Sequence, residues 1–186
     1  MSDLMEQQNL PSTDQMLDLL YTKLANYIGH RSLDSPLLIG IHSGGAWLAA
    51  RLHRKMIDTG LISDPLGTLD ISFYRDDFTR IGLNPKVKPS ALPVSTHDRN
   101  IILIDDVLMS GRTVRAALNV LFEVGRPASV TLAVLIDLNA NELPIKADVA
   151  AHTLTLADNQ RIKLSGPDTL KFEIQELPHS DEHRQN

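Results

Sequence analysis

The sequence contains no cysteine, a single tryptophan and few aromatic residues, which make up 4% of its 186 residues. Without cysteine the chain has neither a disulfide framework nor a thiol nucleophile, so functions that depend on either are excluded. It has no apolar run near the ~20 residues that a membrane helix requires. Met1 is not followed by a charged and then apolar signal segment. We therefore expect a cytoplasmic protein without a membrane association.

The sequence also lacks an excess of basic residues, since its formal net charge is −5. This charge argues against an extensive nucleic-acid footprint, although a local basic patch can coexist with it. With 42% hydrophobic residues, the chain is long enough for one domain with a sizeable core and too short for two ordinary domains. We expect residues 1–186 to form a single domain.

The most informative stretch begins at Asn100. Four consecutive aliphatic residues, 101–104, predict a strand buried on both faces, as in a parallel sheet covered by helices. Two carboxylates, Asp105 and Asp106, stand where this strand is expected to end. A helix is expected next, because apolar residues recur at the spacing of one helix face. These residues are Val114, Ala117, Leu118, Leu121 and Phe122.

Gly125 and Pro127 predict the end of this helix, and residues 129–136 predict a second buried strand. Strand, helix and strand together form a βαβ unit. In open α/β sheets ligands bind at the carboxyl edge of the strands, which is where the loop between Asp106 and the helix falls. The fold class expected is α/β, with a central, mainly parallel sheet flanked by helices.

The loop at residues 110–113 suits a phosphate monoester. Its backbone N–H groups lie at a helix N-terminus, where they lack intrahelical partners and the helix dipole favours an anion. Gly111 allows close approach of the backbone and a positive φ, and the hydroxyls of Ser110 and Thr113 can donate two further hydrogen bonds. A glycine turn at a helix start is nevertheless common and does not by itself establish phosphate binding.

Asp105 and Asp106 repel a phosphate, but carboxylates accept hydrogen bonds from vicinal hydroxyls and bind hard cations such as Mg²⁺. A diol beside a phosphate indicates a ribose 5-phosphate. The alternative is that this aspartate pair is only a solvated strand end.

The run Ile-Leu-Ile-Asp-Asp-Val-Leu-Met-Ser-Gly-Arg-Thr at residues 102–113 resembles the phosphoribosyl pyrophosphate (PRPP) motif of type I phosphoribosyltransferases. The continuation Val-Arg-Ala-Ala-Leu and the later Glu-Leu-Pro-Ile at 142–145 are similar to one branch, the bifunctional pyrimidine operon regulators with uracil phosphoribosyltransferase activity. The resemblance implies that the 5-phosphate of PRPP binds at Met109, Ser110, Gly111, Arg112 and Thr113. It implies that Asp105 and Asp106 bind the ribose, act in catalysis and contact Mg²⁺ indirectly through PRPP.

A second strand, loop and helix precede this motif. A helix is expected at 12–28, a buried strand at 37–41, and then a helix with Leu48, Leu52 and Met56 toward the core. From the residues alone the loop between them is either a tight connection or a binding loop. The resemblance implies that it binds diphosphate, through an unusual peptide geometry, at His42, Ser43, Gly44 and Gly45. Other members often carry arginine where Gly44 stands, and His42 or Arg75 is the candidate replacement for that cation.

Residues 69–74 alternate apolar and polar side chains, which predicts an antiparallel or edge strand. It leads to Arg75, which the resemblance implies is catalytic. Residues 76–99 show little periodicity and contain three prolines. They form either a disordered surface loop or, as the resemblance implies, a lid over PRPP. Its candidate cations are Arg75, Arg80, Lys86 and Lys88.

The resemblance assigns residues 37–136 to the PRPP-binding core, which includes the flexible loop, and residues 137–177 to a small hood and C-terminal strands. It implies uracil contacts at Val107, Leu108, Asp137 and Ala150. Leu138 stands where members usually have arginine. Residues 154–164 predict a hairpin with a polar turn at 157–160, residues 172–174 a further strand, and residues 178–186 a disordered tail.

Two functions remain open. One is a uracil phosphoribosyltransferase that converts uracil and PRPP to UMP and diphosphate with Mg²⁺. The other is a regulator that binds a pyr messenger RNA leader and senses UMP or PRPP in the same pocket, with weak catalysis. Purine relatives usually carry an aspartate where this chain has Met109, which favours a pyrimidine. The resemblance also implies a homodimer or homotetramer.

Overall fold

The computed structural model describes residues 10–71 and 90–177. Within these ranges a five-stranded parallel sheet has the order β2-β1-β3-β4-β5. Its strands are β1 (Leu37–Ile41), β2 (Gly67–Leu69), β3 (Asn100–Leu108), β4 (Ser129–Asp137) and β5 (Val149–Thr153). An antiparallel hairpin of β6 (Gln160–Ser165) and β7 (Lys171–Glu176) forms a separate sheet. The α/β fold with a parallel sheet, predicted from the aliphatic runs, is confirmed.

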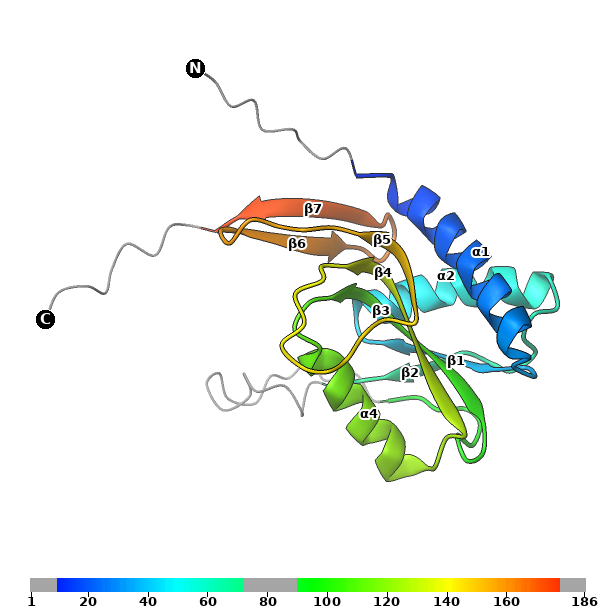
Figure 1. Ribbon diagram of the computed structural model, residues 1–186. Helices are drawn as coiled ribbons and strands as arrows, with labels where there is room; N and C mark the ends of the chain where they lie inside the picture. The colour runs from blue at the N-terminus through cyan, green and yellow to red at the C-terminus, as the bar shows by residue number, and fades with distance from the viewer. Residues whose placement is uncertain (1–9, 72–89, 178–186) are drawn as a thin grey trace, which may run out of the picture.

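Helices cover both faces of the large sheet (Figure 1). Alternating residues of each strand face opposite sides, so that Leu38, Ile102 and Ile104 pack with α1 (Thr13–Arg31) and α2 (Gly44–Asp58). Leu37, Ile39 and Leu103 pack on the other face with α4 (Arg112–Val124). This two-sided burial is the reason that the central strands have continuous apolar sequences.

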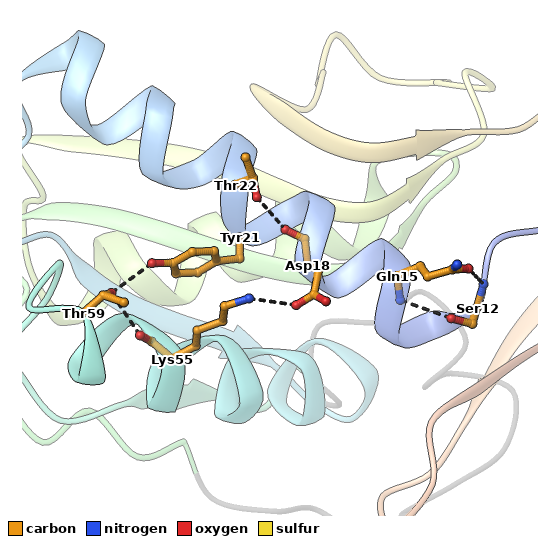
Figure 2. Close-up of polar contacts among 7 residues, drawn as sticks. All are labelled: Ser12, Gln15, Asp18, Tyr21, Thr22, Lys55 and Thr59. Carbon is orange, nitrogen blue, oxygen red and sulfur yellow. Dashed lines mark hydrogen bonds and ion pairs between the residues drawn. The ribbon is translucent and has the colours of Figure 1, made fainter.

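Helix α1 begins where its sequence predicts. The Ser12 hydroxyl accepts a hydrogen bond from the Gln15 N–H, and the Gln15 side chain accepts one from the Ser12 N–H, which together form a capping box. The helix continues past Gly29 to Arg31, three residues beyond the predicted end. Figure 2 shows the side-chain contacts that join α1 to α2, in which Lys55 pairs with Asp18 and the Tyr21 hydroxyl donates to Thr59.

Three strand predictions need correction. Strand β3 does not end before the aspartates but continues to Leu108, because its pairing with β4 extends to Asp137. The strand predicted at 69–74 is an edge strand as expected, but β2 lies at 67–69 and runs parallel to β1, with a single antiparallel bridge from Thr68 to Ala91; residues 72–74 lie outside the described residues. The hairpin predicted at 154–164 is wrong, because β6 pairs with β7 and residues 154–156 are not in a strand.

Two further expectations differ from the structure. Phe122 does not face the core and is 57% exposed, whereas Ala116 and Val120 are buried in its place. Residues 90–99, predicted as part of a structureless loop, pack onto the sheet: Leu92 and Val94 contact the core on the α4 face, and Thr96 is buried. The remainder of the predicted loop, 76–89, and the predicted tail, 178–186, lie outside the described residues.

In the described ranges, no helix combines the length and the apolar character that crossing a membrane requires.

Candidate active site

A cavity of about 380 Å³ lies at the carboxyl edge of the large sheet, beside the start of α4. Most of its walls come from the end of β3, the loop and first turn of α4, and the hairpin strand β6, and Leu138 and Leu156 complete them. The residues that line it are Asp105, Asp106, Val107, Leu108, Met109, Ser110, Gly111, Thr113, Val114, Leu138, Leu156, Gln160, Arg161, Ile162, Lys163 and Leu164. The sequence-predicted phosphate loop and carboxylates therefore share one cavity.

The predicted phosphate loop, residues 110–113, lies at the N-terminus of α4, whose N-cap residue forms no side-chain cap. Gly111 is the N-cap residue of α4 with a φ of 86°, a left-handed conformation that favours glycine. Unlike α1, α4 has no cap from the side chain of its N-cap residue and no acidic residue in its first turn. The Ser110 hydroxyl accepts a hydrogen bond from the Arg112 N–H. The first turn is therefore electrostatically suited to an anion.

The two predicted carboxylates differ in their surroundings. Asp105 is 4% exposed and accepts a hydrogen bond from the N–H of Asp106 at 3.0 Å. Asp106 is half-buried and accepts one from the N–H of Val107 at 3.0 Å. Each carboxylate is thus oriented by the backbone of the residue that follows it, and both line the cavity. Oriented carboxylate oxygens are good acceptors for a vicinal diol.

The predicted diphosphate loop follows β1, the strand next to β3. The N–H of His42 donates to the Leu69 carbonyl oxygen at 2.9 Å, and the peptide bond between His42 and Ser43 is cis. Ser43 is the N-cap residue of α2 but forms no side-chain cap, and the first turn of α2 contains no acidic residue. The unusual peptide geometry implied by the resemblance is present.

The predicted diphosphate loop, residues 42–45, is in direct contact with the aspartate pair. A Cβ atom added to Gly44 would overlap the Asp106 carboxylate, and one added to Gly45 would overlap the Ile104 carbonyl oxygen. Gly44 therefore lies against the Asp106 side chain, and an arginine at position 44 would require this side chain to move. The residues of this loop do not line the described cavity beside α4 but lie against its carboxylate end.

Other predicted residues are placed apart from the cavity walls. Arg112 does not line the cavity, and its guanidinium pairs instead with Glu142. Asp137 and Ala150 are also outside the walls; the Ala150 carbonyl oxygen accepts a hydrogen bond from Lys23 of α1 at 2.7 Å. Val107, Leu108 and Met109 do line it, and Met109 is 55% exposed. Arg75, Arg80, Lys86 and Lys88 lie outside the described residues.

The sequence did not reveal the apolar wall that completes this cavity. Leu138, Leu156, Ile162 and Leu164 supply it, and most of these residues come from or precede the hairpin. Leu164 and Ile162 also pack against the core on the α1 and α2 face. Apolar alternation in 160–164 was the only available signal, and it does not say which cavity the strand adjoins.

Among the described residues, no group of three or more His, Cys, Asp or Glu side chains is arranged to hold a metal ion. The two aspartates thus fit a metal only together with oxygen atoms from a ligand.

Comparison with known proteins identifies the fold and the family. A family model of the phosphoribosyl transferase domain matches residues 7–163. The bifunctional protein PyrR of Nitrosococcus oceani is 54% identical over 172 residues, which cover 90% of this chain and 96% of that protein. The bifunctional protein PyrR of Pseudomonas syringae pv. tomato is 52% identical over 169 residues, which cover 91% of this chain and 97% of that protein.

Solved structures support the same fold at low identity. The hypoxanthine phosphoribosyltransferase of Trypanosoma cruzi superposes with a TM-score of 0.64 at 17% identity and covers 91% of this chain and 96% of its own. The HGPRT-ase of Leishmania tarentolae, in complex with GMP, superposes with a TM-score of 0.63 at 18% identity. This match covers 92% of this chain and 96% of the Leishmania chain. The chain belongs to the phosphoribosyltransferase family, and its relatives at half identity place it among the PyrR proteins.

Proposed function

We propose that this protein transfers the phosphoribosyl group of PRPP to N1 of uracil, with formation of UMP and diphosphate. The observation that carries the proposal is the single cavity that joins an uncapped helix N-terminus, an aspartate pair and an apolar wall. These three parts match the three parts of UMP: its phosphate, its ribose diol and its base.

The phosphate and ribose occupy the first two parts. The N–H groups at the start of α4 and the hydroxyls of Ser110 and Thr113 donate to the 5-phosphate. The carboxylates of Asp105 and Asp106 accept hydrogen bonds from the two ribose hydroxyls. Backbone N–H groups already orient both carboxylates, so they are in place before the ribose binds. The diphosphate lies toward the loop of residues 42–45, which touches Asp106 through Gly44.

The base lies between the apolar residues of the wall and the end of β3, where Val107, Leu138 and Ile162 face the cavity. The two faces of a flat pyrimidine ring suit such a lining. Met109 offers no carboxylate to a purine N7, which supports a pyrimidine substrate. The uracil contacts predicted at Asp137 and Ala150 remain part of this proposal, although both residues lie outside the walls of the described cavity.

In the reaction, uracil N1 forms a bond to the anomeric carbon of PRPP as the bond from that carbon to the diphosphate oxygen breaks, and the N1 proton is released. The protein positions the two reactants and stabilises an oxocarbenium-like transition state through the nearby carboxylates. When bound with PRPP, Mg²⁺ supplies positive charge beside the departing diphosphate. We place the reaction in the cytoplasm and, by resemblance, in a homodimer or homotetramer.

The first experiment is an assay of UMP formation from uracil and PRPP, with orotate, hypoxanthine and guanine as comparison bases and with or without Mg²⁺. We expect turnover of uracil alone, and only with Mg²⁺. Absence of turnover with every base would contradict the enzyme assignment, and preference for a purine would contradict the assignment of the apolar wall.

The ribose assignment has a separate test. We expect the double variant Asp105→Asn and Asp106→Asn to weaken PRPP binding by about tenfold or more in Mg²⁺ buffer, as measured by calorimetry, because neutral amides are weaker acceptors for the diol. Unchanged affinity would show that these carboxylates do not contact the ribose.

A second function, regulation of pyr gene expression through RNA binding, is favoured by the relatives, which are named bifunctional proteins. Several basic side chains already form hydrogen bonds or ion pairs within the molecule, and they include Lys23, Lys55 and Arg99. The test is a mobility shift of a pyr leader transcript at low and moderate salt. We expect a salt-sensitive shift that uridine nucleotides strengthen, and no shift at low salt would remove this function.

A further inference from the structure

The phosphate loop is supported from outside by residues 142–145, which we call the support segment. The carbonyl oxygen of Ser110 accepts hydrogen bonds from the N–H groups of Glu142 and Leu143, each at 3.2 Å. Both N–H groups belong to a chain segment about thirty residues away in sequence. The conformation of Ser110 is thus set by non-local contacts as well as by the start of α4.

Side chains of the same segment extend this support. The Oε2 atom of Glu142 accepts hydrogen bonds from Nε and from a terminal nitrogen of Arg112, at 3.2 and 3.0 Å. Leu143 and Ile145 lie beside Gly111, where an added Cβ would come within 3.3 Å of the Ile145 Cβ. The three consecutive residues 110–112 therefore each contact the support segment.

The support segment is itself held at both sides. On one side the N–H of Leu138 donates to the Leu108 carbonyl oxygen at 2.9 Å. On the other side the Asp148 carboxylate accepts from the N–H of Leu132 at 2.8 Å, and the Asp148 N–H donates to the Leu132 carbonyl oxygen. Because β3 and β4 fix both ends, the segment can hold the loop in a set position.

The Arg112 guanidinium is placed by this arrangement outside the cavity walls, whereas Gly111 and Thr113 on either side of it line the cavity. Its pairing with Glu142 also balances a carboxylate that would otherwise stand unpaired near an anion site. Both side chains are 58% exposed, so simple charge attraction between them is weak. The geometric effect, in which one carboxylate oxygen fixes a guanidinium by two donors, is the more important one.

We propose that the Glu142 carboxylate is a positioning group for phosphoribosyl binding, which acts through the Arg112 guanidinium to hold the phosphate loop in its anion-binding conformation, while the backbone N–H of Glu142 separately supports Ser110. The proposal rests on the function proposed above. It predicts a selective effect: substrates that carry the 5-phosphate lose affinity when Glu142 is changed, and the base does not.

The test compares Glu142→Ala and Glu142→Gln with a matched control, Glu173→Ala. Glu173 pairs with Lys171 at 3.1 Å on the exposed hairpin, a surface ion pair outside the cavity walls. For each variant the KM for PRPP, the KM for uracil, the Kd of UMP and the Tm are measured. We expect Glu142→Ala to raise the PRPP KM and the UMP Kd about fivefold, with the uracil KM and the Tm within the range of the control.

Glu142→Gln keeps an oxygen that accepts from Arg112, so we expect it to restore most of the lost affinity. The proposal is overturned if Glu142→Ala leaves PRPP and UMP binding within twofold of the parent, or if both KM values rise together with a loss of Tm. A parent protein that forms no UMP would contradict the proposed function, and UMP affinity alone would then decide the role of Glu142.

Discussion

The loops before α2 and α4 follow neighbouring parallel strands and end in helices without side-chain caps, yet they are packed in different ways. Around the loop before α2, added Cβ atoms at Gly44 and Gly45 would overlap atoms of β3. Around the loop before α4, an added Cβ at Gly111 would come no closer than 3.3 Å to its nearest neighbour, the Ile145 Cβ, and its glycine is required chiefly by a positive φ.

This difference shows that glycine serves two purposes in one site. In the predicted diphosphate loop, the absence of a side chain lets the backbone of Gly44 and Gly45 approach the Asp106 carboxylate and the Ile104 carbonyl oxygen closely. In the phosphate loop it permits a left-handed residue at the helix start. We infer that substitutions in the first loop disturb packing against β3, whereas substitutions in the second disturb local backbone conformation and the contacts with residues 142–145.

The largest effect is expected for Gly45→Ala. The added methyl group would overlap the Ile104 carbonyl oxygen and approach the Asp105 Cα atom, and these backbone atoms cannot turn away as a side chain could. We expect a loss of about 3 kcal/mol in the free energy of unfolding, measured by urea denaturation.

Gly29→Ala is the control for this variant. Gly29 lies inside α1, and an added Cβ would meet nothing within 4 Å. There alanine is the better helix residue, and we expect a gain of about 0.5 to 1 kcal/mol. If the two variants had equal stability, close packing of Gly45 against β3 would not be the reason for its glycine.

A smaller effect is expected for Gly111→Ala. Its φ of 86° disfavours alanine, at a cost of about 1 to 2 kcal/mol in unfolding free energy. Gly60→Ala is matched to it, because Gly60 has a φ of 70° and open space at its Cβ position. We expect both variants to lose stability, with a somewhat larger loss at Gly111, where the added Cβ would also stand 3.3 Å from the Ile145 Cβ, and a loss of UMP affinity only at Gly111. Equal UMP affinities would argue against its loop as the phosphate site.

The sequence predicted those parts of the fold that local pattern determines. The aliphatic runs at 37–41 and 101–104 gave buried strands, because a parallel strand covered on both faces must be apolar throughout. The hydroxyl and glycine residues at 110–113 predicted a turn into a helix, which the structure confirms at the start of α4, while its role in phosphate binding stays a prediction.

Features that depend on distant pairing were not predictable in the same way. The end of β3 is set by the partner residue Asp137 in β4, and the hairpin wall by the pairing of Leu164 with Phe172. Phe122 was assigned to the core because it is apolar at a helical spacing. At ~100° per residue it lies about 80° from Val114 around the helix, on the side away from the buried Ala116 and Val120.

The contact between Gly44 and Asp106 was also invisible in the sequence, and it yields the smallest and most specific effect. The three atoms nearest to a methyl group at Gly44 all belong to the Asp106 side chain, whose carboxylate can rotate, unlike the backbone atoms beside Gly45. We expect Gly44→Ala to cost about 0.5 to 1 kcal/mol of unfolding free energy.

The cause of that cost can be isolated with a double-mutant cycle. In a background of Asp106→Ala the atoms at the overlap beyond Cβ are absent, so Gly44→Ala should cost much less than it does in the parent. Coupling of about 0.5 kcal/mol or more, measured by urea denaturation of the four proteins, would establish that the aspartate excludes a side chain from the diphosphate loop. Strict additivity would mean that position 44 is limited by the backbone, as position 45 is, and the contrast between the two glycines would then disappear.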